Sequence, residues 1–163
     1  MENFESQLTF TRFYDICQKY SGNTALIYLG QKFSYGALER LVDKFATGLT
    51  NLGVKKGDKV MLYISNCPQW LIANYAINRI GAVTVPVSPI YTAFEIEYMM
   101  KDAGIETVIC LDTNFVYVKD VMKRFELKRV IVTNLVDLVP WWKRTIGHML
   151  DKIPAGVVEK GKD

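Results

Sequence analysis

The sequence predicts an α/β fold built on an open, doubly wound parallel sheet with helices on both faces, preceded by a helix and a small β-hairpin. Between residues 35 and 133, short apolar runs bounded by turn residues alternate with longer segments of helical periodicity. Each apolar run lacks a polar face, which is typical of parallel strands that helices cover on both sides. The chain has 163 residues, 50% of them hydrophobic and 23% charged, as expected for a single globular domain.

Residues 1–34 are predicted to contain a leading helix and a hairpin. Residues 9–20 carry apolar side chains at helical spacing, and Ser21-Gly22-Asn23 ends this pattern. Residues 25–29 and 32–35 are typical of two strands, and the two-residue turn between them is predicted to be Gly30-Gln31.

The predicted core spans residues 35–133 and begins with a helix over residues 35–52, which Gly53 ends. Its buried stripe is predicted to consist of Leu38, Leu41, Val42, Phe45 and Leu49. Strands are expected at residues 59–64, 82–86, 107–111 and 129–132, and helices at residues 68–80, 92–103 and 116–125. Residues 134–163 form an amphipathic segment and a polar tail, in which Pro140 predicts the start of a helix.

Charge and cysteine content exclude several classes of function. The 20 basic and 17 acidic residues give a net charge of +3 and are spread along the chain, which argues against nucleic acid as a partner. Cys17, Cys67 and Cys110 are far apart in mostly apolar stretches, so we expect reduced, buried thiols rather than disulfides or metal ligands. The N-terminus has no secretory pattern and no apolar run is long enough to span a bilayer. These features predict a cytoplasmic protein, with a peripheral membrane contact as the alternative.

No catalytic residue and no metal ligand is assigned from motifs. Neither a dinucleotide-binding nor a P-loop glycine pattern occurs, and the single histidine, His148, is interpreted as structural. Asp112 ends a predicted strand, where a phosphoacceptor is one interpretation. Such a site needs further carboxylates after the first parallel strand, but Ser65-Asn66-Cys67 occupies that position. A loop or capping role for Asp112, and a capping role for Ser65-Asn66-Cys67 before Pro68, are therefore favoured.

Residues 78–100 resemble a segment of the adenylate-forming enzymes. The matching positions are Gly81, Ala82, Val83, Pro86, Pro89, Tyr91, Thr92 and Glu95. Residues 33–38 and 52–60 are similar to two upstream motifs of the same family, so the resemblance covers most of the chain in the right order. The chain departs from the family pattern at Ala37, at Ser88 and in residues 64–68. Tyr91-Thr92 and the strand ending at Thr133 most resemble long- and medium-chain fatty-acyl-CoA ligases.

The resemblance implies that the chain is the N-terminal part of an AMP-forming acyl-CoA synthetase. Such an enzyme joins a carboxylate to AMP and then transfers the acyl group to CoA, using ATP, Mg²⁺ and CoA. The family's phosphate loop, adenine-binding segment and C-terminal lysine do not occur in these residues, so the chain alone is expected to be an inactive scaffold that binds no cofactor tightly. Its expected partners are the remainder of the ligase, with fatty acid and CoA as substrates.

Two segments are candidate contact sites. In related ligases, the loop matching Ser88, Pro89, Ile90, Tyr91 and Thr92 lies near the CoA nucleotide. In the amphipathic segment, Trp141, Trp142, Lys143 and Arg144 suit a membrane interface, although packing on the chain's own sheet or on the remaining ligase is the favoured interpretation. A homodimer is a further expected partner state. The alternative function, from another class, is a stand-alone, non-catalytic α/β binding or regulatory module.

Overall fold

The computed structural model describes residues 9–149 and Gly156. The strands are β1 (Thr24–Tyr28), β2 (Gln31–Ser34), β3 (Lys59–Tyr63), β4 (Val83–Pro86), β5 (Thr107–Leu111) and β6 (Arg129–Thr133). The α-helices are α1 (Thr9–Lys19), α2 (Tyr35–Asn51), α3 (Pro68–Arg79), α4 (Ala93–Ala103), α5 (Phe115–Met122) and α6 (Trp141–Met149). A 3₁₀ turn, η1 (Asp112–Asn114), precedes α5. Apart from η1, each element lies where the sequence predicts it, within a few residues at the ends.

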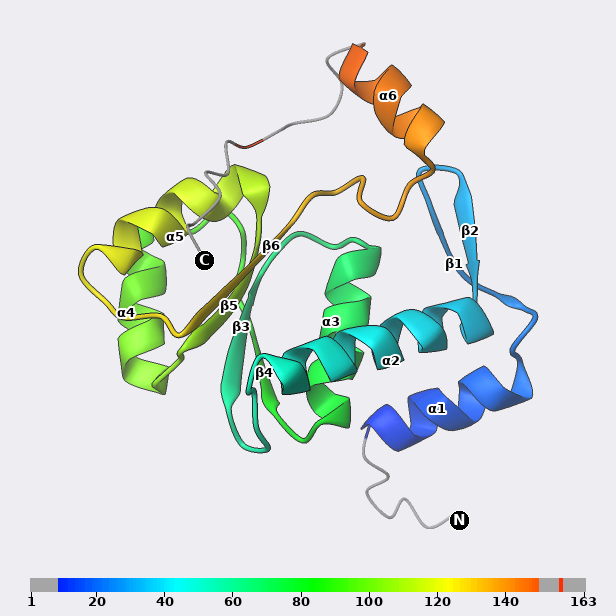
Figure 1. Cartoon of the computed structure of the whole chain (residues 1–163), viewed down its shortest axis with the longest axis horizontal. Coiled ribbons are helices and arrows are strands. Elements are labelled where there is room, and N and C mark those ends of the chain that lie inside the picture. Colours follow the sequence, from blue (N-terminus) through cyan, green and yellow to red (C-terminus); the bar gives the residue numbers. More distant parts are fainter. Residues whose placement is uncertain (1–8, 150–155, 157–163) are drawn as a thin grey trace.

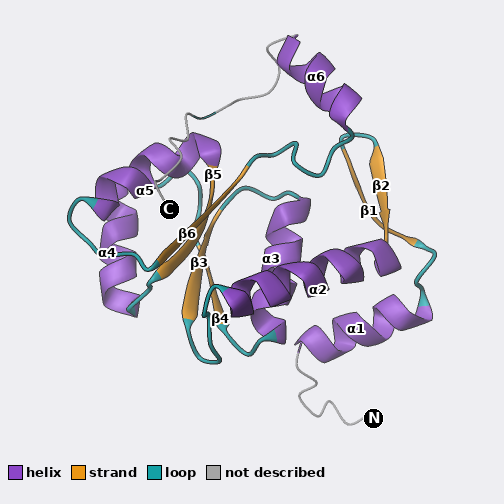
Figure 2. Cartoon of the chain, viewed as in Figure 1, coloured by secondary structure: helices purple, strands orange, loops and turns teal. Residues whose placement is uncertain are grey.

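These elements form a parallel four-stranded sheet between two helical layers (Figure 1). The strand order is β4-β3-β5-β6, and β1 and β2 form a separate antiparallel hairpin. Helices α2 and α3 cover one face of the sheet and α1 packs against these two helices, whereas α4 and α5 cover the other face (Figure 2). This arrangement confirms the predicted doubly wound α/β class.

The two central strands, β3 and β5, divide the interior into two cores because successive side chains of a strand point to opposite faces. The core under α1–α3 receives Val60, Leu62, Ile109 and Leu111. The core under α4 and α5 receives Met61, Tyr63, Val108 and Cys110. All eight side chains are at most 3% exposed, which explains why these strands have no polar face.

The sequence places α2 correctly but misjudges part of its buried face. The Ser34 hydroxyl accepts a hydrogen bond from the Ala37 amide at 3.2 Å and so caps the helix. Leu38 is 1% exposed, whereas Leu41 and Phe45 are only half-buried. The small Ala46 takes part in the core beside Leu38 instead. Leu41 and Phe45 line an apolar hollow of about 330 Å³ between α2, α3 and the side of the sheet that carries β6.

The hairpin turn differs by one residue from the prediction. Tyr28 pairs with Gln31, so the two turn residues are Leu29 and Gly30 rather than Gly30 and Gln31. Both turn residues have positive φ, 48° for Leu29 and 70° for Gly30. Positive φ at both positions is the geometry that joins right-twisted strands through a type I′ turn. The prediction failed because a leucine rarely adopts this conformation, so glycine was placed first in the turn.

The predicted helix start at Pro140 is confirmed, since α6 begins at Trp141. The predicted helical residues 150–153 lie outside the described residues, as does the side chain of His148. Cys17 and Cys110 are buried free thiols, as predicted, and burial raises their pKa values to about 11 and about 12. Both thiols therefore stay protonated and unreactive at neutral pH. The prediction of a buried thiol is wrong for Cys67, which is the N-cap residue of α3 and only half-buried.

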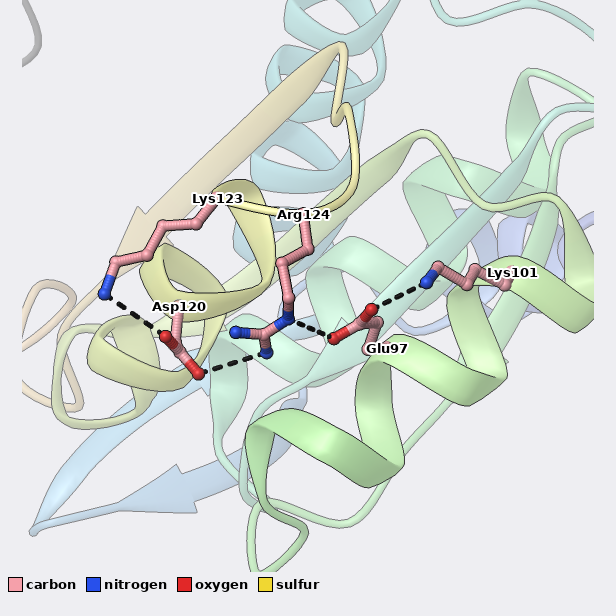
Figure 3. Close-up of polar contacts among 5 residues, drawn as sticks. All are labelled: Glu97, Lys101, Asp120, Lys123 and Arg124. Carbon is pink, nitrogen blue, oxygen red and sulfur yellow. Dashed lines mark hydrogen bonds and ion pairs between the residues drawn. The ribbon is translucent and has the colours of Figure 1, made fainter.

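An ion-pair cluster joins α4 to the C-terminal end of α5 and the two residues that follow it (Figure 3). Glu97 binds Lys101 at 2.7 Å and Arg124 at 2.9 Å, and Arg124 also reaches Asp120 at 3.1 Å. Lys123 completes the cluster on Asp120 at 3.2 Å. These hydrogen bonds hold the pKa values of Glu97 and Asp120 below their ordinary range, so the pairs persist at neutral pH and are lost in acid. Because most of these side chains are partly exposed, the ion pairs add little to the free energy of unfolding. Their main effect is to fix how α4 and α5 lie against each other.

Burial in α2 predicts different costs for two substitutions. Leu38→Ala should lower the free energy of unfolding by about 2–5 kcal/mol, because it removes a side chain enclosed on all sides. Phe45→Ala should cost clearly less than the roughly 3–5 kcal/mol of an enclosed phenylalanine, because part of its ring faces the hollow. Urea unfolding of both variants checks the order, and an equal or larger loss for Phe45→Ala would contradict it.

Candidate ligand-binding loop at the carboxyl edge of the sheet

The order of the strands creates a switch point at the carboxyl edge of the sheet. The chain runs from β3 through α3 to β4 on one side, and then through α4 to β5 on the other side of β3. Open α/β sheets bind ligands in the crevice beyond the strand ends where the order reverses in this way. The connections that meet at this edge are residues 64–67, 87–92 and 112–114.

The predicted contact loop, residues 87–92, is held to the edge by two buried side chains. The phenol of Tyr63, the last residue of β3, donates a hydrogen bond to the carbonyl of Tyr91. The side-chain amide of Asn114 donates to the carbonyl of Pro89 at 2.7 Å and is only 8% exposed. Burial raises the pKa of Tyr63 above its ordinary value, which keeps the phenol protonated as a donor. The loop backbone is therefore fixed at two points, by Tyr63 of β3 and by Asn114 of η1.

The end of the loop is fixed by the start of α4. The Glu95 carboxylate accepts hydrogen bonds from the Thr92 backbone amide at 2.8 Å and from the Thr92 hydroxyl at 2.9 Å. Within the loop, the Tyr91 amide donates to the Ser88 carbonyl at 3.2 Å and closes a turn. The pKa of Glu95 is lowered mainly by the hydrogen bond from the Thr92 backbone amide and further by the bond from the Thr92 hydroxyl. This reciprocal cap holds the loop's last residue at the head of the helix.

A hollow of about 420 Å³ lies between this loop and the connection after β3. It is lined by Ile64, Ser65, Asn66, Trp70, Pro86, Val87, Ser88 and Pro89. None of these side chains is charged, so the hollow can pack and hydrogen-bond an uncharged group but supplies no cation to neutralise a phosphate.

The five predicted loop residues have different surroundings. Ser88 and Pro89 line the hollow, whereas Ile90 is 82% exposed and does not. Tyr91 is half-buried, and its carbonyl accepts the hydrogen bond from Tyr63. We call this bond and the bond from Asn114 to the Pro89 carbonyl the latch. Thr92 caps α4. The structure thus places two of the five residues in the lining of the hollow, and the other three belong to the loop but do not line it.

Asp112 has a structural role in the described part of the chain. Its carboxylate accepts hydrogen bonds from the Thr113 amide at 3.0 Å, the Asn134 side chain at 2.8 Å and the Gly156 amide at 2.9 Å. Among residues 9–149 and Gly156, no group of three or more His, Cys, Asp or Glu side chains is placed to hold a metal ion. These contacts favour the loop interpretation of Asp112 over a phosphoacceptor.

The predicted capping role of the residues before Pro68 is wrong in detail. The N-cap of α3 is Cys67, which makes no side-chain capping bond. Ser65 and Asn66 line the hollow instead, which frees their polar groups for a ligand. Sequence reasoning also missed Tyr63 and Asn114 as loop anchors, because no local pattern indicates a bond to a carbonyl 28 or 25 residues away.

The predicted membrane candidates lie on α6, apart from this hollow. Trp141 is 79% exposed and Trp142 is 48% exposed. The Lys143 ammonium lies 5.3 Å from the centroid of the Trp142 ring, within the range of a cation–π contact. The side chain of Arg144 lies outside the described part of the structure. In that part, no helix has both the length and the apolar character to cross a membrane.

The latch predicts a loop whose order depends on Tyr63. Tyr63→Phe should lower the free energy of unfolding by about 1 kcal/mol and speed hydrogen exchange at the amides of residues 87–92, because the Tyr91 carbonyl loses its buried donor. Tyr98→Phe is the matched control, since this tyrosine is 68% exposed on α4. Exchange measured by mass spectrometry should change only in the first variant; unchanged loop exchange in Tyr63→Phe would show that the latch does not order the loop.

Comparisons with known proteins agree with this architecture. The family model described as "AMP-binding enzyme" matches residues 13–152. A long-chain-fatty-acid–CoA ligase of Bacillus subtilis is 28% identical over 85% of this chain, and one of Salmonella typhimurium is 31% identical over 87%. The chain spans about a quarter of the length of these curated relatives, 25% and 26% respectively.

Two solved structures share the fold. The benzoate CoA ligase of Burkholderia xenovorans has a TM-score of 0.72 at 19% identity, covering 94% of this chain and 30% of the ligase. A long-chain-fatty-acid-CoA ligase of Archaeoglobus fulgidus has a TM-score of 0.72 at 22% identity, covering 91% of this chain and 31% of the other. With a family model that matches most of its residues and a sheet and helices arranged as in these ligases, the chain belongs to the AMP-binding enzyme family.

Proposed function

We propose that this chain is the N-terminal part of an ATP-dependent fatty-acid–CoA ligase, which activates a carboxylate as acyl-AMP and transfers the acyl group to CoA. The observation that carries the proposal is the match of residues 13–152 to the AMP-binding enzyme family. The choice of a fatty acid as the carboxylate rests on the long-chain-fatty-acid–CoA ligases among the curated relatives, which match 85% to 87% of this chain.

In this ligase the chain acts as a scaffold rather than as the catalytic centre. Adenylation needs groups that neutralise charge on the transferring phosphoryl group. The described hollow has no charged lining, and the 163 residues contain no Gly/Ser/Thr-rich phosphate loop. ATP, Mg²⁺ and the phosphates of CoA are therefore expected to bind residues from the remainder of the ligase chain, with Mg²⁺ supplying positive charge at the phosphates.

The loop Ser88, Pro89, Ile90, Tyr91 and Thr92 is the proposed contact of this chain with CoA. Its support is the uncharged hollow beside Ser88 and Pro89 at the switch point of the sheet. Such a surface suits the adenine ring or the pantetheine arm of CoA better than its phosphates. The double anchor from Tyr63 and Asn114 would present that surface without a rearrangement on binding.

We further propose a peripheral membrane contact through Trp141, Trp142, Lys143 and Arg144 of α6. An exposed tryptophan pair beside basic residues suits the interface between headgroups and acyl chains. A fatty-acid substrate partitions into membranes, so this contact would bring the cytoplasmic ligase to its substrate. A homodimer is a separate proposal, and equilibrium sedimentation of the chain tests it.

Activity should depend on residues outside this chain. The purified 163-residue chain should show no carboxylate-dependent exchange of labelled pyrophosphate into ATP, because it lacks the phosphate loop. A longer reading frame that contains the chain should show exchange with straight-chain fatty acids and should form their CoA thioesters. Benzoate is the comparison substrate. Pyrophosphate exchange by the 163-residue chain would refute its role as an inactive scaffold. Activity of the longer protein on benzoate but not on fatty acids would refute the proposed substrate.

The α6 contact should give weak, salt-sensitive binding to anionic vesicles. Replacing both Trp141 and Trp142 by Ala should reduce co-sedimentation, because the exposed indole rings provide the apolar contact area. Raising the ionic strength should weaken binding through Lys143 and Arg144. Absence of binding at low salt, or binding that is indifferent to both tryptophans, would leave α6 as a packing element alone.

A further inference from the structure

We infer that the tip of the β1–β2 hairpin is a second half of the lipid-contact surface and inserts Ile27 and Leu29 into an anionic membrane beside α6. This inference rests on the proposed membrane contact of α6. We call the surface formed by Ile27, Leu29, Trp141, Trp142 and Lys143 the lipid-contact tip.

The hairpin tip and the start of α6 are in direct contact although 114 residues separate the two partners in the sequence. The Lys143 ammonium donates a hydrogen bond to the Leu29 carbonyl at 3.1 Å, and the same ammonium lies against the Trp142 ring. A Cβ placed on Gly30 would lie 3.2 Å from this nitrogen, which shows how closely Lys143 approaches the turn. Figure 1 shows α6 beginning beside the hairpin tip. Lys143 therefore joins the two elements into one surface.

Large apolar side chains of both contacting elements are exposed. Ile27 is 63% exposed and Leu29 is 57% exposed, beside Trp141 and Trp142 of α6. An exposed apolar residue is ordinary when it is isolated, but a group of them on adjoining elements marks an interaction surface. The hairpin thus adds aliphatic side chains to the aromatic ones that the sequence already indicates.

Leu29 also holds a backbone conformation that a leucine avoids. With φ at 48°, its Cβ crowds the following carbonyl, and asparagine or glycine is the ordinary choice at this position of a type I′ turn. A leucine side chain cannot offset this strain through a local hydrogen bond, as an asparagine side chain can. Strain kept at an exposed position points to a functional use of the side chain. The turn projects an apolar group at the extremity of the hairpin, where it can enter a lipid surface.

The charge of the tip selects an anionic surface. Residues 24–34 and 141–149 contain Lys32, Lys143 and Arg144 but no Asp or Glu. Apolar side chains bordered by cations match the boundary between acyl chains and anionic headgroups. The hollows described at the sheet edges and beside α1–α3 are lined by residues other than those of the tip. A protruding, cationic and apolar tip fits a fluid lipid surface better than a shaped protein surface.

The experiment uses substitutions that remove apolar surface without weakening the hairpin. Leu29→Asn places a favoured residue at positive φ, and Ile27→Thr retains a β-branched side chain in an exposed strand. Phe94→Ser is the matched control, because Phe94 is 81% exposed on α4, on the opposite face of the sheet. Each full chain is titrated with vesicles of phosphatidylcholine alone and of equimolar phosphatidylcholine and phosphatidylglycerol at low salt. Thermal unfolding and sedimentation equilibrium are measured in parallel.

We expect the parent chain and Phe94→Ser to bind the anionic vesicles equally and the neutral vesicles more weakly. Leu29→Asn and Ile27→Thr should each lower the partition coefficient by about fivefold or more, the effect of withdrawing one largely inserted aliphatic side chain. Leu29→Asn should unfold at the same temperature as the parent or higher, which separates loss of binding from loss of folding.

Three results would overturn the inference, and they are distinguishable. Full vesicle binding by both hairpin variants, with loss in the double tryptophan variant, would refute the hairpin contact and leave the α6 contact in place. Failure of the parent chain to bind any vesicle would refute both. Self-association of the parent chain that Leu29→Asn abolishes, without vesicle binding, would assign the tip to a second copy of the chain.

Discussion

The burial of β3 and β5 on both faces is the constraint on which the rest of the structure depends. Their alternating side chains enter two separate cores, so neither strand is stable unless helices cover both faces. The chain meets this requirement by sending α3 to one face and α4 to the other, with β3 between β4 and β5 in the sheet. The same crossing creates the switch point at the carboxyl edge. The candidate site is therefore a consequence of how the core is covered.

Arg129 ties the opposite, amino edge to the helical layer. Its guanidinium donates to the Leu52 and Gly53 carbonyls at the end of α2, at 2.5 Å and 2.7 Å, and to the Thr107 hydroxyl at 3.2 Å. A positive charge at a helix C-terminus satisfies carbonyls that have no partner within the helix and complements the helix dipole. Because Arg129 starts β6, this contact also sets where the outer strand lies against β5. The carboxyl edge, which Arg129 does not brace, is held instead by the latch of Tyr63 and Asn114.

The sequence predicts the elements of this fold well because the patterns that specify them are local. Short apolar runs and helical stripes identify the strands and helices to within a few residues of their ends, and Pro140 marks a helix start. The strand order and the latch are not local. Tyr63 belongs to the same apolar run as Val60, Met61 and Leu62, and its partner is a backbone carbonyl that any residue could supply. The role of Tyr63 follows from topology, which the pattern of apolar residues leaves open.

Two of the detailed errors, in α2 and at the hairpin, have opposite physical causes. In α2, periodicity assigned Phe45 to the core because it follows the same stripe as Leu38, yet the sheet beneath it ends near β6 and leaves a hollow. Burial there depends on the width of the sheet rather than on the helix. At the hairpin, the turn was assigned by residue preference, and Leu29 departs from that preference with a φ of 48°. Departures of the second kind are the more informative ones, because the hollow explains the first, whereas turn preference alone would not place a leucine at this position. We infer that this leucine is kept for its apolar side chain, at a cost in stability that an asparagine in the same turn would avoid.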